Sequence, residues 1–337
     1  MSDLRGNIDR REYLKSAACT VGFLMTPSLL RAAVSEIPPR PDELVFPSQT
    51  DPQIQTFDFT HGVYFPTHNT PRRGLFVFFP GTQKEANVIQ KPGVPWLCKW
   101  ASLLGYHAIF LMYPNTVAAA EACRDSPDPD AFSTFRWAII EGGDTQYIKI
   151  PRIECIENRL IKLLLYLDRR HPHGGWGEFV SGEQINWARV TVSGGSQGGG
   201  HAAIIATRYL VSRVLCFGAP KDYSRYAAKP AKWYDKSVTP PSRYFAFNHR
   251  QDNFGCTPAQ QIENLNRLGI AQLGVADVDQ EARPFHGAHA LFTNYPGTKI
   301  DHLKAHVSVC LGDIKMPTSR PHFAPVWAYM LTTPIAG

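Results

Sequence analysis

The residues with the most definite chemical meaning are 194–198, whose sequence Gly-Gly-Ser-Gln-Gly follows the pattern Gly-X-Ser-X-Gly. A short β-branched run, residues 189–193, precedes them, and an apolar run typical of a helix, residues 202–206, follows. A serine on a sharp turn between a strand and a helix is a nucleophile elbow, because small neighbours let the turn expose the hydroxyl. The pattern therefore predicts Ser196 as a nucleophile, with an ordinary Gly/Ser turn as the alternative.

A serine nucleophile needs a base and an acid, because its hydroxyl holds its proton too tightly at neutral pH. In chains built around this elbow the acid follows the nucleophile, and the base histidine lies in a loop near the C-terminus. We predict Asp252 as the acid, because it comes just after the apolar stretch 244–247, and His306 as the base. The alternatives are Asp277 and Asp279 for the acid and His286, His289 and His302 for the base.

The oxyanion of an acyl-transfer intermediate needs two backbone N–H donors. One is expected from Gln197, directly after the nucleophile, and the other from the loop after the buried strand 74–79. That loop reads Pro-Gly-Thr, so we predict Thr82 as the second donor and Gln83 as the next choice. An ordinary Pro-Gly turn is the alternative.

The overall composition excludes several classes of protein. The chain has 337 residues, enough for one large α/β domain, and its hydrophobic content of 44% is that of an ordinary globular protein. The net charge of +6 comes from scattered Lys and Arg, so nucleic-acid binding is not expected. After the N-terminus no apolar run is long enough to span a membrane, so stable membrane insertion is not expected either.

The N-terminus resembles a twin-arginine export signal. Arg10 and Arg11 precede a moderately apolar stretch, residues 16–30, and a small-residue cleavage site follows. We therefore expect a signal peptide at 1–33, a Pro-rich tether at 34–52 and a catalytic domain at 53–337. The twin-arginine translocation machinery is then a partner during export, and the location is periplasmic or secreted. An amphipathic first helix with a chance Arg pair is the alternative.

Six cysteines remain after residue 33, and an even number in an oxidising compartment favours disulfides. Cys256 lies four residues past Asp252 and Cys310 lies four past His306, so these two thiols are a candidate pair. Cys123 and Cys155 flank a long irregular region, 114–144, and are a second candidate pair. None of the cysteines has the close spacing of a zinc site.

Apolar strand-like runs alternate with helical periodicity along most of the chain, which predicts a mostly parallel sheet covered by helices on both faces. Region 114–144 is expected as a surface excursion. Between two strands, Trp233 and Tyr234 lie in an aromatic segment that forms either a substrate wall or a packed surface loop. The expected strands are 74–79, 107–113, 189–194, 214–217, 243–248 and 290–294, and the expected helices are 95–104, 152–170, 198–210, one opening at 257 and 321–331.

These motifs together resemble the α/β-hydrolase superfamily over most of residues 54–335. Ser-Gln-Gly-Gly at 196–199 is similar to the elbow of acetyl-xylan esterases and cephalosporin deacetylases, although the Arg-Gly-Gln segment of those families is missing and His306 is not followed by Glu. The segments at 218–222 and 248–252, together with Ala305-His306, look more like a little-characterised group of secreted bacterial hydrolases. The resemblance implies an α/β-hydrolase fold and hydrolytic chemistry.

The expected activity is hydrolysis of a carboxylic ester, in a small molecule or a polymer, through an acyl-enzyme on Ser196. This chemistry requires no metal and no organic cofactor. Two alternatives remain open at the level of the sequence. One is an amidase, peptidase or acyltransferase with the same residues, and the other is a non-catalytic binding protein on the same scaffold.

Overall fold

A computed structural model of the chain describes residues 40–68, 70–83, 94–311 and 321–335. All of them belong to one compact unit, Ile37–Gly337. The predicted signal peptide at 1–33 and the first part of the predicted tether lie outside the described residues.

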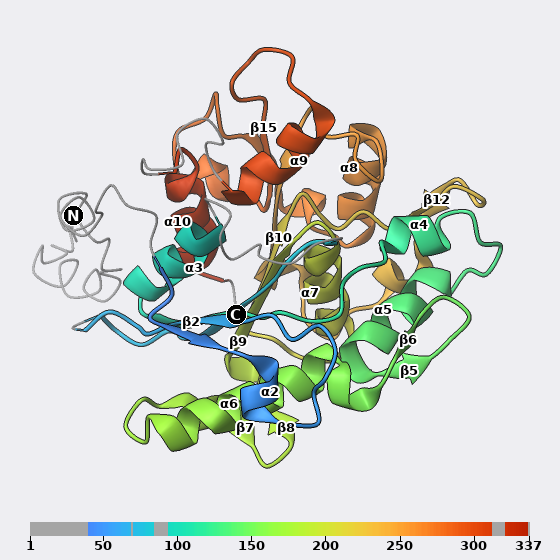
Figure 1. The fold of residues 1–337 in the computed structure, drawn as a ribbon. Helices are drawn as coiled ribbons and strands as arrows, with labels where there is room; N and C mark the ends of the chain where they lie inside the picture. Colours follow the sequence, from blue (N-terminus) through green and yellow to red (C-terminus); the bar gives the residue numbers. More distant parts are fainter. Residues whose placement is uncertain (1–39, 69, 84–93, 312–320, 336–337) are drawn as a thin grey trace, which may run out of the picture. The chain divides into compact units, whose positions relative to one another are not determined.

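Nine strands of the described residues form one sheet in the order β1-β2-β4-β3-β9-β10-β13-β15-β14 (Figure 1). The neighbours of β2 are antiparallel to it, and every other pair in the sheet is parallel. The strands are β1 (Glu43–Val45), β2 (His61–Tyr64), β3 (Gly74–Phe79), β4 (Tyr106–Phe110), β9 (Val190–Gly195), β10 (Arg213–Phe217), β13 (Tyr244–His249), β14 (Val275–Asp277) and β15 (Ala290–Thr293). Three two-stranded ribbons lie outside it: β5 (Gly143–Asp144) with β6 (Lys149–Ile150), β7 (Val180–Ser181) with β8 (Gln184–Ile185), and β11 (Tyr223–Ser224) with β12 (Lys229–Pro230).

Helices cover both faces of the sheet. The helix α3 packs with α9 and α10, whereas α5 packs with α6 and α7 (Figure 1). The α-helices are α2 (Pro47–Thr50), α3 (Val94–Leu103), α4 (Ala119–Cys123), α5 (Ala131–Glu141), α6 (Ile156–Arg170), α7 (Gln197–Arg208), α8 (Pro258–Arg267), α9 (His302–Leu311) and α10 (Ala324–Thr332). The 3-10 helices are η2 (Arg152–Glu154), η3 (Trp176–Phe179), η4 (Trp187–Arg189), η5 (Lys232–Asp235), η6 (Pro241–Arg243), η7 (Ala271–Leu273) and η8 (Phe285–Gly287). The prediction of a mostly parallel sheet with helices on both faces is confirmed.

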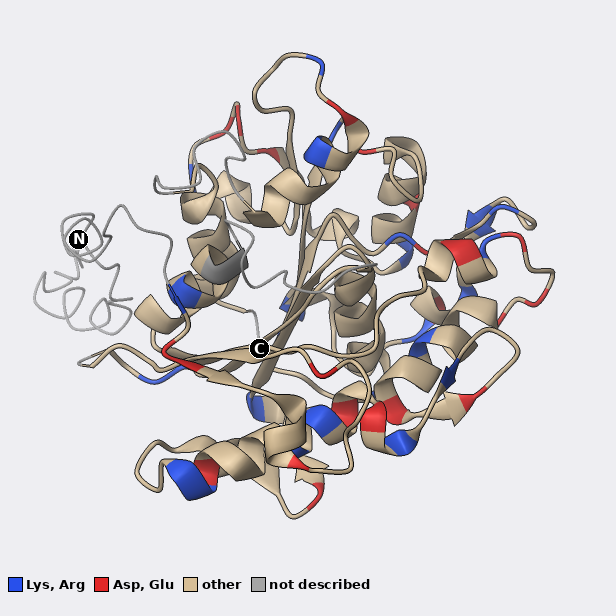
Figure 2. Cartoon of the chain, viewed as in Figure 1, with Lys and Arg blue, Asp and Glu red and all other residues tan. Residues whose placement is uncertain are grey.

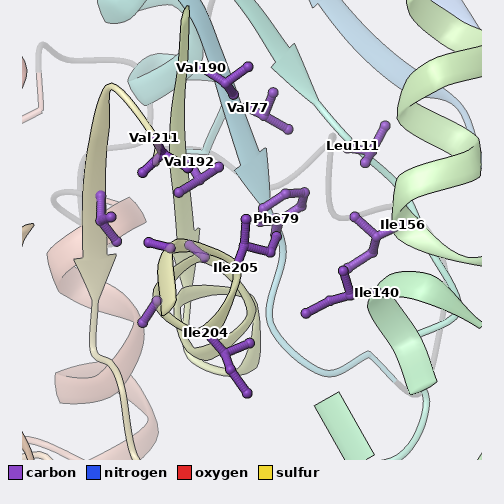
Figure 3. Packing of buried hydrophobic residues seen from close by; sticks show 14 of the residues in the cluster. Val77, Phe79, Leu111, Ile140, Ile156, Val190, Val192, Ile204, Ile205 and Val211 are labelled. Carbon is purple, nitrogen blue, oxygen red and sulfur yellow. The ribbon is translucent and has the colours of Figure 1, made fainter. Parts of the chain in front are cut away.

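The central strands are apolar at successive positions because both of their faces are buried. Along β3, Val77 and Phe79 point into the core on the side of α7, whereas Phe78 stacks on Phe110 of β4 in a separate packing. Figure 3 shows side chains of β3 and β9 on the side of the sheet that faces Ile205 of α7, with residues of α5 and α6 nearby. The end of β9, where the elbow begins, is therefore held in place between its two neighbours in the sheet, β3 and β10.

Two predicted irregular regions are ordered. Residues 43–50, assigned to the tether, form β1 and α2, because Val45 is fully buried in the main core and β1 pairs with β2. The predicted surface excursion at 114–144 contains α4 and α5, and α5 buries Phe135 and Ile139. In the first region both elements are short, and in the second the prolines and acids of 125–130 precede the apolar α5, so neither region shows a clear periodic pattern over its length.

Candidate active site

Ser196 lies on a strained turn between β9 and α7, with φ of 54° and ψ of −122°. Its N–H donates to the Phe217 carbonyl at the end of β10, at 2.8 Å. A Cβ atom on Gly198 would lie 2.0 Å from the carbonyl oxygen of Phe79, so only glycine fits between the start of α7 and β3. The backbone thus has the geometry of a nucleophile elbow, with its serine half-buried.

Asp252 and His306 form a buried hydrogen bond, with 2.8 Å between Oδ2 of Asp252 and Nδ1 of His306. Asp252 follows β13, two strands from the elbow, as its position after a strand predicts. His306 lies in the helix α9 and not in a loop, which corrects the expectation for the base. The apolar residues of 302–311 fall mostly at alternate positions, 303, 305, 307, 309 and 311, which is the periodicity of a strand and conceals the helix.

Helix α9 packs directly against the turns that flank Ser196. A Cβ on Gly218, just past β10, would lie 3.2 Å from Nδ1 of His306, and one on Gly195 would lie 3.2 Å from Sγ of Cys310. Nε2 of His306 is buried and has no hydrogen-bond partner among the described residues. The ring nitrogen opposite the carboxylate is therefore free, and within the same residues no hydrogen bond joins it to Ser196.

The charge of Asp252 is stabilised by two partners. Burial alone raises the pKa of this carboxyl group, but the hydrogen bond and charge of His306 and then the ammonium of Lys221 outweigh burial and lower the pKa below its ordinary value. Nζ of Lys221 lies 2.9 Å from Oδ2, and the backbone N–H of Phe254 donates to Oδ1 at 2.9 Å. Asp252 is thus an ionised carboxylate with both oxygens occupied.

The loop after β3 lies against the nucleophile, because a Cβ on Gly81 would come 2.9 Å from Cβ of Ser196. Asn115 holds this loop by donating through Nδ2 to the carbonyls of residues 80 and 81, at 3.0 and 2.6 Å. The N–H of Gln83 is bound to the Asn115 carbonyl, whereas that of Thr82 has no partner among the described residues. Of the two predicted donors in this loop, Thr82 is the one with an available N–H.

Gln197, the other predicted donor, is the first residue of α7, where backbone N–H groups lack partners inside the helix. Its side chain is buried and bound on every side. Nε2 donates to Oδ1 of Asn115 and to the carbonyl of Val117, and Oε1 accepts from the N–H of Ala119. Gln197 and Asn115 therefore connect the two loops that meet at Ser196.

The alternative acids and bases are bound elsewhere. Asp277 is paired with Arg250, and Asp279 accepts from Thr293. His302 bonds through Nδ1 to the carbonyl of residue 251, and His289 bonds to that of residue 244. His286 is exposed and faces Glu281 at 3.6 Å, so none of these groups bonds to Asp252 or His306.

The predicted substrate wall is wrong for Tyr234, whereas Trp233 is half-buried and its place in such a wall stays a prediction. Tyr234 is 2% exposed and belongs to the main core, and its hydroxyl accepts from the N–H of Asp222. Trp233 donates through Nε1 to Oδ2 of Asp222 at 2.8 Å, and that carboxylate also binds the buried guanidinium of Arg136. Both aromatic side chains pack around a buried ion pair, because their polar atoms are needed to satisfy it.

Neither disulfide that the sequence indicated is present, since all six cysteines of the described residues are free and buried. Sγ of Cys310 lies against the elbow, whereas Sγ of Cys256 donates to a glutamine of α8. Cys123 donates to a carbonyl at the start of α5, whereas Cys155 caps α6. Each thiol of a predicted pair therefore has a separate local partner.

Sequence reasoning missed three residues at this site. Asn115 and Lys221 follow the ends of β4 and β10, so the rule that found Asp252 applied to them as well. Phe254 is 52% exposed, and its ring stacks on that of His306 with 5.1 Å between centroids. It has no comparable signal, because an isolated aromatic residue in a loop is indistinguishable from a packing residue.

Among the described residues, no group of three His, Cys, Asp or Glu side chains could hold a metal ion. Within the same residues, every helix is too short or too polar to cross a membrane. Lys and Arg are interspersed with Asp and Glu and are not gathered by sign (Figure 2).

No protein-family model and no curated protein matches the chain. Among solved structures, an α/β hydrolase from a Medee basin deep-sea metagenome library is 16% identical, with 70% of this chain and 76% of that chain covered and a TM-score of 0.37. A thermophilic esterase from Thermogutta terrifontis is 15% identical, with 78% and 84% covered and a TM-score of 0.38. An alpha-beta serine hydrolase homologue from Coxiella burnetii is 11% identical, with 68% and 84% covered and a TM-score of 0.38.

These identities and TM-scores are too low to assign the fold by similarity. The fold is therefore assigned from the sheet and the turn at Ser196. The strand order, the antiparallel β2, the helices on both faces and the turn at Ser196 are those of an α/β hydrolase. The chain therefore has the α/β-hydrolase fold.

Proposed function

We propose that this chain is an exported serine hydrolase that cleaves carboxylic esters. The observation that carries the proposal is the buried Asp252–His306 hydrogen bond, with a free Nε2 on a helix packed against the strained turn of Ser196. His61, His107 and His201 also have a buried nitrogen without a partner among the described residues, so the support comes from the combination of a carboxylate on Nδ1, a free Nε2 and the elbow beside the same helix.

In the proposed reaction Oγ of Ser196 attacks the ester carbonyl and its proton passes to Nε2 of His306. The N–H groups of Gln197 and Thr82 hold the oxyanion, and Asp252 stabilises the imidazolium. Collapse of the tetrahedral intermediate expels the alcohol, which takes the proton from His306. Water then attacks the acyl-enzyme, gives a proton to His306, and releases the carboxylic acid as that proton returns to Ser196.

The test is covalent labelling and turnover by the purified protein. We expect a fluorophosphonate probe to label the wild type, p-nitrophenyl acetate to be hydrolysed, and Ser196→Ala to abolish both, with a loss of roughly 10⁴–10⁶-fold in turnover. Ser193→Ala is the matched control, because Ser193 is a buried serine of β9 with an unpartnered hydroxyl. It should keep its activity. Activity that survives Ser196→Ala would refute the proposal.

The bond that is cleaved is tested separately. Because oxygen is a better leaving group than nitrogen, we expect an aryl acetate to be turned over much faster than the matching anilide. Equal or faster cleavage of the anilide would make the chain an amidase or peptidase. If the fluorophosphonate probe labels neither the wild type nor any variant, the chain is better explained as a non-catalytic binding protein.

Export is proposed from the paired Arg10 and Arg11 ahead of an apolar stretch. Expression of the full chain in a bacterium, followed by fractionation, tests it. We expect a shortened product outside the cytoplasm and retention of the double variant Arg10→Lys/Arg11→Lys inside. An equal distribution of the two proteins would contradict the proposal.

A further inference from the structure

Lys221 brings a positive charge to the carboxylate that orients the proposed base. Its side chain is 10% exposed, and Nζ lies 2.9 Å from Oδ2 of Asp252, which is itself 2% exposed. Oδ2 is the same oxygen that meets Nδ1 of His306 at 2.8 Å. The ammonium and the imidazole therefore share one acceptor atom.

The lysine is not needed to satisfy the carboxylate. Without it, Asp252 would still accept from His306 through Oδ2 and from the N–H of Phe254 through Oδ1. Burying a lysine costs free energy, because its ammonium is strongly hydrated in water. A residue that adds charge where hydrogen bonding is already complete acts chiefly through electrostatics.

The direction of that electrostatic effect follows from the order of the three groups. The negative charge of Asp252 stabilises the protonated form of His306, and the positive charge of Lys221 offsets part of it. His306 acts as a base only when it is neutral. One unit charge a few Å away at an intermediate dielectric changes an ionisation by about one pH unit or more.

Other titratable groups around His306 do not supply this effect. Burial raises the pKa of Cys256 to about 11 and that of Cys310 to about 12, so both thiols are neutral near pH 7 and carry no charge beside His306. On α3, Lys99 faces Asp42 at 3.9 Å, and the buried Cys98 has a raised pKa. Other titratable groups on neighbouring described segments include His249, which bonds to the carbonyl of residue 295, His302, which bonds to that of residue 251, Lys304, Asp301, which accepts from the first N–H groups of α9, and Asp222, which is paired with Arg136.

We propose that Lys221 is a positioning residue that acts through Asp252 and keeps His306 neutral, and so competent as a base, under mildly acidic conditions. This inference rests on the proposed serine hydrolase function.

The experiment compares Lys221→Met, which removes the charge and keeps the length of the stem, with Lys221→Arg, which keeps the charge. Lys232→Met is the matched control, because it removes an exposed lysine from an aspartate outside the site. For each protein the rate of fluorophosphonate labelling of Ser196 is measured from pH 4 to pH 9. Proton NMR of the imidazoles, assigned with His306→Asn, follows the titration of His306 without any reaction.

We expect Lys221→Met to move the acid limb of the labelling profile and the NMR titration of His306 upward by about one pH unit. Lys221→Arg and Lys232→Met should keep the wild-type limb. A merely structural role would lower the melting temperature and the rate plateau of Lys221→Met without moving either titration. That result, or an unmoved His306 titration in a folded variant, overturns the inference.

The two proposals fail in different ways. Absence of labelling in the wild type would refute the hydrolase and leave the NMR titration as a direct test of the charge effect. A labelled wild type with identical acid limbs for all variants would refute only the role of Lys221. Should Lys221→Met fail to fold, Lys221→Gln provides the same comparison with a polar side chain.

Discussion

Two aspartates follow neighbouring strands of the sheet, and each is buried beside a cation. Asp222 follows β10 and is held by Arg136 through two hydrogen bonds of 2.6 and 2.5 Å. Asp252 follows β13 and is held by Lys221 and His306. Both carboxylates are 2% exposed, so burial does not distinguish them.

The two clusters differ in the group that meets the carboxylate. Around Asp222 the guanidinium also donates to the carbonyl of Gln197 and lies 3.4 Å from Nδ1 of His201, and Trp233 donates to the carboxylate, but no imidazole of the described residues bonds to Asp222 itself. Around Asp252 an imidazole bonds to the carboxylate directly, and its other nitrogen, Nε2, has no partner among the described residues. A carboxylate held by a guanidinium locks elements together, whereas a carboxylate bonded to an imidazole with a free second nitrogen supports a group that can take up a proton.

The largest expected effect is on activity, after substitution of Asp252. Asp252→Asn should lower kcat for p-nitrophenyl acetate by about 10⁴-fold, because an amide no longer fixes the tautomer of His306 or stabilises its cation. The protein should remain folded, as circular dichroism would record. More than a tenth of wild-type activity in this variant would remove Asp252 from the proposed triad.

The next effect is on stability, after substitution of the partner of Asp222. Arg136→Met should lower the free energy of unfolding by about 3–5 kcal/mol, because it leaves Asp222 buried without its partner. Urea denaturation measures the loss. Arg225→Met is the matched control, since Arg225 makes the same two-bond contact with Asp125 on the surface, at 2.6 Å for each bond. A change no greater than in this control would contradict the structural role of Arg136.

A smaller effect concerns the pH dependence of stability. The pKa of Asp252 is lower in the folded protein than its ordinary value, so its ionisation stabilises the fold above the unfolded pKa of about 3.9. That contribution is lost as the pH falls through the lowered pKa. The difference in unfolding free energy between wild type and Asp252→Asn should therefore shrink as the pH falls from 6 to 3. A constant difference would show that the carboxylate is not linked to folding.

The smallest effect is expected at Phe254, whose exposed ring stacks on His306. In the proposed mechanism the alcohol leaves beside His306, so its substituent lies near this ring. Phe254→Ala should lower kcat/KM for an aryl ester by a few-fold, with less effect on a methyl ester, because a stacked aromatic contact contributes about 1 kcal/mol. Equal losses for the two esters would limit the ring to orienting His306.

Much of the fold was predictable because the central strands are apolar on both faces and end at clear turn residues. The helix α8 begins at its predicted cap, Thr257, with Pro258 next and both bonds of the capping box present. The misses were β1, α2 and α5. The first two are short, and α5 directly follows a segment rich in prolines and acids, 125–130. Such segments become ordered through tertiary packing, which local periodicity does not report.

At the site, chain order and strand ends were enough to choose Asp252 and His306, and these two side chains are in contact. Lys221 and Asn115 also follow the carboxyl ends of parallel strands. Charged and amide side chains are so common in loops that this position alone does not identify them as site residues. Tyr234 was misread because its surroundings include the buried ion pair of Asp222 with Arg136. Arg136 lies far away in the chain, so the sequence near Tyr234 does not indicate this pair.

The six buried thiols have a practical consequence. Burial keeps them protonated, with the pKa of Cys216 and of Cys310 raised to about 12, so alkylating reagents should react with them only when the surrounding element opens. Cys310 sits one helical turn beyond His306, whereas Cys216 lies inside the sheet. The native cysteines can therefore report local unfolding. Pulsed alkylation with mass spectrometry would show how often the helix α9 and the central sheet open and expose their thiols.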